Sequence, residues 1–77
     1  MPEDRKMIER HLAQAEEAVR LGRSHIARQI EIVAELERDG HDATTARELL
    51  RTFEDLQVQH EGHRDRLLAE LRDLGTP

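Results

Sequence analysis

A seven-residue repeat of apolar and small residues runs along almost the whole chain and is interrupted only once. In the first half the repeat consists of Ile8, Leu12, Ala15, Val19, Gly22, Ile26, Gln29, Val33 and Leu36. The steps between these residues alternate between four and three, which is the spacing of the buried stripe of a coiled-coil helix. We therefore expect a helix over about residues 3–39, with Pro2 suited to its first turn.

The interruption is the segment Asp39-Gly40-His41-Asp42. Gly40 suits the left-handed conformation that commonly follows the end of a helix. The carboxylate of Asp42 can accept the N–H of Thr44 or Thr45 at the start of a second helix. Because residues 40–42 form so short a connection, the second helix is expected to run antiparallel to the first.

The repeat resumes after the turn and predicts a second helix over about residues 43–74. Its stripe is expected to consist of Ala46, Leu49, Phe53, Leu56, His60, His63, Leu67, Glu70 or Leu71, and Leu74. We therefore predict one all-α domain over residues 1–77. Its architecture is an antiparallel two-helix hairpin that resembles a coiled coil.

A hairpin of 77 residues has a small core of its own. Chains of this size rarely gain more than roughly 3–5 kcal/mol from one core unless something staples them, and the chain has no cysteine for a disulfide. A second, weaker apolar stripe consists of Ala18, Leu21, Ile30, Ile32, Leu50, Val58 and Leu68. We expect a homodimer that buries this stripe, most simply as a four-helix bundle. The alternative is a monomer with scattered apolar surface residues, which are normal.

Charge and hydropathy limit the kinds of molecule that the chain is expected to bind. Charged residues make up 38% of the chain, and its net charge is −5 with histidine neutral. Nucleic acids and anionic membranes attract concentrated basic surfaces, so neither is an expected partner. No apolar run approaches the length of a membrane span, and the N-terminus lacks the apolar segment of a signal peptide. The expected localisation is cytoplasmic.

One level of the hairpin departs from the apolar pattern. Folding the chain at the turn places Gly22 opposite His60, with Gly62 at nearly the same height. His63 follows one turn along, and His25 flanks the level on the first helix. A glycine inside a helix costs about 1 kcal/mol relative to alanine. Two of them at one level indicate close backbone approach, room for a bulky neighbour, or a bend.

Three interpretations of this level stay open. His60 and His63 can be polar stripe residues that set register or oligomeric state. They can make the hairpin pH-responsive, since an imidazole in a packed stripe is destabilised as it gains a proton between about pH 7 and 5. With His25 they can also bind zinc or nickel, because imidazole nitrogens suit both ions. No other cofactor is expected, and His11 and His41 are expected to be solvated.

Catalytic patterns are missing from the sequence. There is no cysteine nucleophile and no glycine-rich phosphate loop, and Ser24 directly precedes His25, which points the two to different sides of a helix. We therefore do not expect an enzyme. The leading hypothesis is a non-enzymatic interaction module, a homodimeric bundle whose exposed face docks a protein partner. The alternatives are a small metal- or pH-responsive protein that uses the histidines, and a regulatory partner of a neighbouring gene product.

Three stretches carry a resemblance to other proteins: His25-Ile26-Ala27-Arg28-Gln29, residues 32–42 and residues 46–54. They combine an arginine-rich helix, the Asp-Gly-His-Asp turn and a leucine-rich second helix. In these features the chain resembles a group of short, uncharacterised proteobacterial helical-hairpin proteins. The resemblance covers about half of the chain. It implies a helical hairpin and transfers no functional residue.

Overall fold

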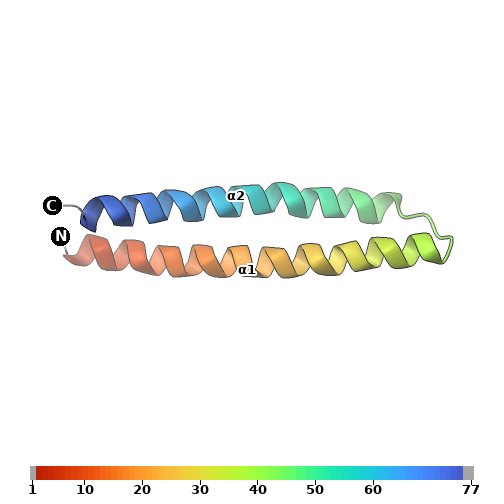
Figure 1. Ribbon diagram of the computed structural model, residues 1–77, viewed down its shortest axis with the longest axis horizontal. Coiled ribbons are helices and arrows are strands. Elements are labelled where there is room, and N and C mark those ends of the chain that lie inside the picture. The colour runs from red at the N-terminus through yellow and green to blue at the C-terminus, as the bar shows by residue number, and fades with distance from the viewer. Residues whose placement is uncertain (1, 76–77) are drawn as a thin grey trace.

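The computed structural model describes residues 2–75 as two α-helices joined by a short turn (Figure 1). Helix α1 spans Pro2–Arg38 and helix α2 spans Thr44–Gly75. Each boundary lies one residue from the one expected from the sequence. The helices run antiparallel and pack against each other, so the N-terminal end of α1 and the C-terminal end of α2 lie together (Figure 1). The prediction of an all-α two-helix hairpin is confirmed.

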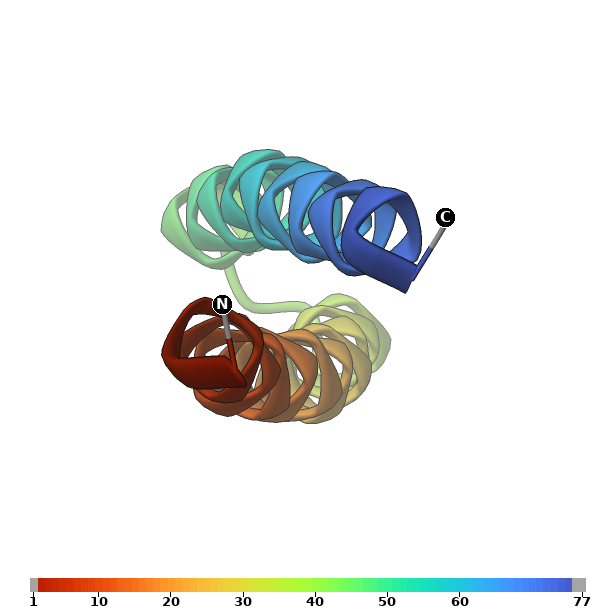
Figure 2. The same cartoon turned by 90° about the vertical axis from the view of Figure 1, so that its left-hand side faces the viewer.

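The hairpin is a thin rod of about 60 × 14 × 14 Å. Seen along its length, the two helices wind around each other in the left-handed sense (Figure 2). A strict seven-residue repeat imposes this winding, because seven residues fall slightly short of two full turns of a straight helix. Within residues 2–75, neither helix has a stretch long and apolar enough to cross a membrane.

Helix α1 ends in a Schellman motif centred on Gly40. Gly40 has a φ of 74°. The N–H of His41 donates to the carbonyl of Leu36 at 2.8 Å, and the N–H of Gly40 donates to the carbonyl of Glu37 at 3.2 Å. These bonds satisfy carbonyls that have no partner inside the helix. The expected left-handed glycine at the end of the first helix is therefore confirmed.

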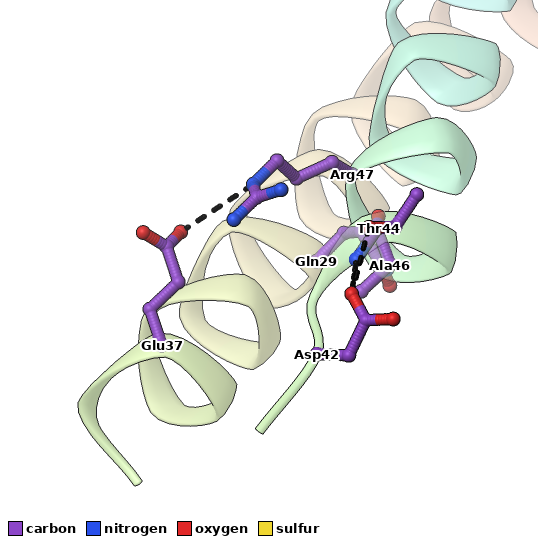
Figure 3. A network of polar contacts seen from close by, with 6 residues as sticks. All are labelled: Gln29, Glu37, Asp42, Thr44, Ala46 and Arg47. Carbon is purple, nitrogen blue, oxygen red and sulfur yellow. Dashed lines mark hydrogen bonds and ion pairs between the residues drawn. The ribbon is translucent and has the colours of Figure 1, made fainter. Parts of the chain in front are cut away.

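Helix α2 is capped by the residue that the sequence suggests. Oδ1 of Asp42 accepts the backbone N–H of Thr44 at 3.0 Å and its hydroxyl at 2.7 Å. Arg47 lies 3.8 Å from Glu37 and links the two helices beside the turn (Figure 3). Ala43, between the cap and the helix, is only 2% exposed. The turn is therefore packed against the helices as well as hydrogen-bonded.

The core runs as a seam between the helices. On α1 all nine residues expected in the stripe are buried or half-buried. Facing it are buried and half-buried residues at alternating steps of three and four, which begin just before α2 and continue along it: Ala43, Ala46, Leu50, Phe53, Gln57, His60, Arg64, Leu67 and Leu71. The expected stripe is thus right at Ala46, Phe53, His60, Leu67 and Leu71, and it is wrong at Leu49, Leu56, His63 and Leu74, which are exposed.

The error on α2 has a geometric reason. Leu49, Leu56 and His63 were expected in the seam, and all three are exposed. Leu50, Gln57 and Arg64, each one position further along, take their places. Two stripes with the same spacing share every second residue, so periodicity alone permits either. The stripe that packs is the one that brings Gln57 against α1.

Replacing Gly40 by alanine tests the turn. No described atom lies within 4 Å of the position that a Cβ would take at Gly40. The only cost is therefore the left-handed backbone, and we expect the free energy of unfolding in urea to fall by about 1 kcal/mol. Gly40→Asn should lose less, because asparagine adopts this conformation more readily. An alanine variant as stable as the unmodified chain would contradict the assignment.

The cap predicts a dependence of stability on pH. Hydrogen bonds from the hydroxyl and the N–H of Thr44 hold the pKa of the Asp42 carboxyl below its ordinary value of 3.8. The ionised carboxylate therefore favours the folded state. Its contribution is present above the pKa of the unfolded chain and is lost as pH falls through the lower folded pKa.

The melting temperatures of the unmodified chain and Asp42→Ala measure this contribution. Their difference should be constant near neutral pH and shrink as pH falls below about 4. Asp42→Asn is the control, because an amide oxygen accepts the same hydrogen bonds without titrating. A gap between the unmodified chain and Asp42→Ala that stays constant down to pH 2 would show that Asp42 does not act through its charge.

Candidate functional site

Two buried glutamines tie the helices together. Nε2 of Gln29 on α1 donates to the carbonyl of Ala46 at 2.9 Å. Figure 3 shows these two residues next to each other. Nε2 of Gln57 on α2 donates to the carbonyl of Val19 at 2.9 Å. Each side chain reaches the backbone of the opposite helix, and they are 6% and 7% exposed. Sliding one helix along the other would break both bonds and leave two buried amides unsatisfied, at about 1–3 kcal/mol each.

Gly22 makes room for Gln57. A Cβ built at Gly22 would lie 1.8 Å from Oε1 of Gln57 and 2.8 Å from its Cδ. The space beside Gly22 is thus filled by the amide from α2. The side chain that packs against Gly22 is Gln57, three residues before the His60 that was expected opposite it, and His60 borders the same depression as Gly22.

Gly62 has no comparable constraint. Among the described residues, a Cβ at Gly62 would meet only Nη1 of Arg66, at an ordinary contact distance of 3.6 Å. Of the explanations that two glycines suggested, room for a bulky neighbour therefore holds at Gly22 alone.

The carbonyl oxygen of Gln57 is an unsatisfied buried acceptor. Val19 offers a carbonyl, which can only accept, so Nε2 of Gln57 must face it and Oε1 must face the other way. Within the described part of the chain Oε1 finds no hydrogen-bond donor. A desolvated acceptor in this state costs about 1–3 kcal/mol. The folded state therefore contains one buried oxygen atom whose hydrogen-bonding capacity is unused.

Two histidines border this place from opposite helices. They line a depression of about 80 Å³, whose surrounding residues are Gly22, His25, Phe53, Leu56, Gln57 and His60. The imidazole of His25 packs on Phe53, with ring centroids 5.9 Å apart and planes tilted by 39°. The structure therefore brings together two of the three histidines predicted as metal ligands.

The third histidine lies elsewhere. His63 is exposed and borders a second, wider depression of about 400 Å³ with His11, Gln14, Ala15 and Ala18. His41 is exposed in the turn. Within residues 2–75, no group of three or more histidine, cysteine, aspartate or glutamate side chains is placed to hold a metal ion. Zinc or nickel binding by His25, His60 and His63 stays a prediction, and one chain does not gather these three histidines in one depression.

The two long faces of the hairpin differ in chemistry. The depressions show that His11, Ala18 and His25 share one face with Leu56 and His63. Residues seven apart occupy equivalent positions in a coiled coil, which adds Ile32 and Leu49 to this face. The histidine–leucine face is therefore His11, Ala18, His25, Ile32, Leu49, Leu56 and His63. It carries no permanently charged side chain over this length.

The opposite, charged face follows from the same repeat. Its positions are Glu9, Glu16, Arg23, Ile30, Glu37, Arg47, Glu54, Glu61 and Leu68. Seven of these nine residues are charged, and the Glu37–Arg47 ion pair crosses between the helices on this face.

The second apolar stripe expected from the sequence is divided. Ala18 and Ile32 lie on the histidine–leucine face, and Leu21 is exposed. Ile30, Val58 and Leu68 are exposed away from the histidine–leucine face, while Leu50 is half-buried in the seam. Leu49 and Leu56, which the sequence assigned to the seam, supply the exposed leucines instead.

Gln57 is the residue that sequence reasoning missed. It stands seven residues from both Leu50 and Arg64, at a position of the seam. The sequence does contain a signal for this position. Gln57 is a long polar side chain within the repeat, and the other helix has a glycine near its middle that can leave space for it.

Family models, curated proteins and solved structures were each compared with the chain, and no match was found. Its function is therefore inferred from the geometry of the two faces and the depressions.

The two glycines give a matched pair of substitutions. Gly22→Ala displaces the amide of Gln57 and breaks its bond to Val19, so we expect a net loss of about 1–2 kcal/mol in the free energy of unfolding. Gly62→Ala meets no obstacle and should gain about 1 kcal/mol from helix propensity. Urea denaturation followed by circular dichroism measures both changes.

A double variant isolates the cause. In a Gln57→Ala background the obstacle is gone, so Gly22→Ala should become stabilising. If Gly22→Ala is equally harmful with and without Gln57, the proposed contact is not the reason for the glycine.

Proposed function

We propose that this chain is a non-enzymatic interaction module that forms a homodimer through its histidine–leucine face and so completes a four-helix bundle. The observation that carries the proposal is the contrast between the two faces. One presents leucine, isoleucine, alanine and histidine, and the other presents seven charged residues in nine positions. Leu49 and Leu56, 44% and 43% exposed, would be buried by a partner.

The charge distribution favours this face as the surface on which two copies of the chain meet. The chain has a net charge of −5, so two copies repel each other unless they meet where charge is absent. The histidine–leucine face fulfils this condition over most of its length, and the same repeat reaches acidic residues beyond both of its ends: Asp4 and Glu70 toward the open end, and Asp39 and Asp42 beside the turn. The charged face then points to solvent in both copies.

The size of the face fits a stable dimer. The rod is 60 Å long and 14 Å wide, which corresponds to roughly 800 Å² on each partner, the area typical of a specific protein interface. Burying it also supplies the second layer that a two-helix hairpin lacks.

Symmetry places the centre of this interface. The midpoint of Pro2–Arg38 is residue 20, and the midpoint of Thr44–Gly75 lies between residues 59 and 60. In a two-fold dimer whose copies overlap along their full length, these levels face each other. The centre is thus near Ala18, whose small side chain permits close approach. A further protein partner and the cytoplasmic localisation stay predictions.

Two leucines with the same exposure test the choice of face. Leu49 lies on the histidine–leucine face and Leu68 on the charged face, and they are 44% and 43% exposed. Light scattering after size exclusion at low micromolar concentration should give the dimer mass for the unmodified chain. Leu49→Glu should raise the dissociation constant about 100-fold, because two buried leucines are lost per dimer.

Leu68→Glu adds the same charge on the other face and should leave the dimer intact. A folded monomer for the unmodified chain would end the proposal. A dimer broken by Leu68→Glu but not by Leu49→Glu would move the interface to the other face.

A further inference from the structure

Donor atoms from both helices meet at the smaller depression. His25 comes from α1, and His60 and Gln57 come from α2. The other residues around it are Gly22, Phe53 and Leu56. No residue in this set carries a permanent charge, so no lysine or arginine there repels a cation.

We propose that this depression binds a divalent transition-metal ion through the imidazoles of His25 and His60, with Oε1 of Gln57 as an oxygen ligand. Imidazole nitrogens suit zinc, nickel and copper, which they bind at about 2.0–2.1 Å. His25 is exposed in the single chain, so water can take the remaining positions there. A volume of about 80 Å³ accommodates such an ion together with one or two waters, each of which occupies about 30 Å³ in the liquid.

Gln57 supplies an independent reason for a cation at this place. Its side chain is 93% buried, and Oε1 has no donor among the described residues. The amide cannot turn over to hide this oxygen, because its nitrogen is held by the carbonyl of Val19. A bound cation satisfies the oxygen without breaking that bond.

The second depression is a natural control. His11 and His63 border it from opposite helices, as His25 and His60 border the first. It is wider, at about 400 Å³, and its remaining residues are Gln14, Ala15 and Ala18. None of these is a buried polar group left without a partner among the described residues. We expect no comparable ion there.

Binding would staple the hairpin. The ligands come from both helices of one chain, so the ion resists their separation and stabilises the folded state by mass action. The site does not require the dimer, and it differs from the histidine set expected from the sequence by exchanging His63 for Gln57.

Zinc chloride alone is the probe, with the full-length chain freed of metal by a chelator. At zinc concentrations about 100 times the dissociation constant, the melting temperature should rise by about 10 °C. Calorimetry should give one ion per chain. His25→Gln and His60→Gln should each weaken binding at least tenfold, and His11→Gln and His63→Gln should leave it unchanged. The zinc-dependent shift is taken relative to each variant's own metal-free melting temperature, so any loss of packing is separated from loss of binding.

Two results would overturn the site: no zinc-dependent shift in the unmodified chain, or a shift that depends on His11 or His63 but not on His25 and His60. Light scattering with and without zinc separates this question from the dimer. If the chain is a dimer without zinc and zinc neither binds nor changes its mass, the proposed interface stands and the metal site is overturned. If one zinc ion binds to a monomer, the metal site stands and the proposed interface is overturned.

Discussion

The reciprocal bonds from Gln29 to Ala46 and from Gln57 to Val19 fix how the two helices meet. Among the described residues, the buried apolar side chains are few and mostly small or medium in size: Leu12, Ala15, Val19, Val33, Ala43 and Leu67. Apolar burial is not directional, so these contacts tolerate sliding. The two amides do not tolerate it, because each finds its acceptor only in one register. Gly22 is part of the same arrangement, since the absence of a side chain there leaves space for Gln57.

This register decides what each face displays. With Gln57 in the seam, Leu49, Leu56 and His63 turn outward onto one face and the glutamates Glu54 and Glu61 onto the other. A hairpin packed on the alternative stripe would bury those leucines and lose the uncharged face. The surface on which the proposed dimer depends is therefore a product of two hydrogen bonds in the interior.

The parts that could be predicted from the sequence are those with local causes. The helix ends follow from Gly40 and Asp42, whose conformations depend on a few neighbouring residues. The seam of α1 has only one apolar stripe with the right spacing. On α2 two stripes share Phe53 and His60, and the choice between them depends on contacts with α1. The histidine set depends on the same contacts: His63 borders the wider depression, and Gln57 borders the smaller one with His25 and His60.

The positions of the two glutamine bonds also give the hairpin a direction of assembly. Gln29 and Ala46 are 17 residues apart in the chain, and Gln57 and Val19 are 38 apart. Closing the shorter loop loses less chain entropy, so pairing starts beside the turn and travels toward the open end. Beyond Gln57, Leu12, Ala15 and Leu67 form an apolar cluster between the helices, flanked by Ile8 and Leu71. By this entropy argument, pairing of the two helices propagates away from Gly40, and the open end of the hairpin is the last part to pair.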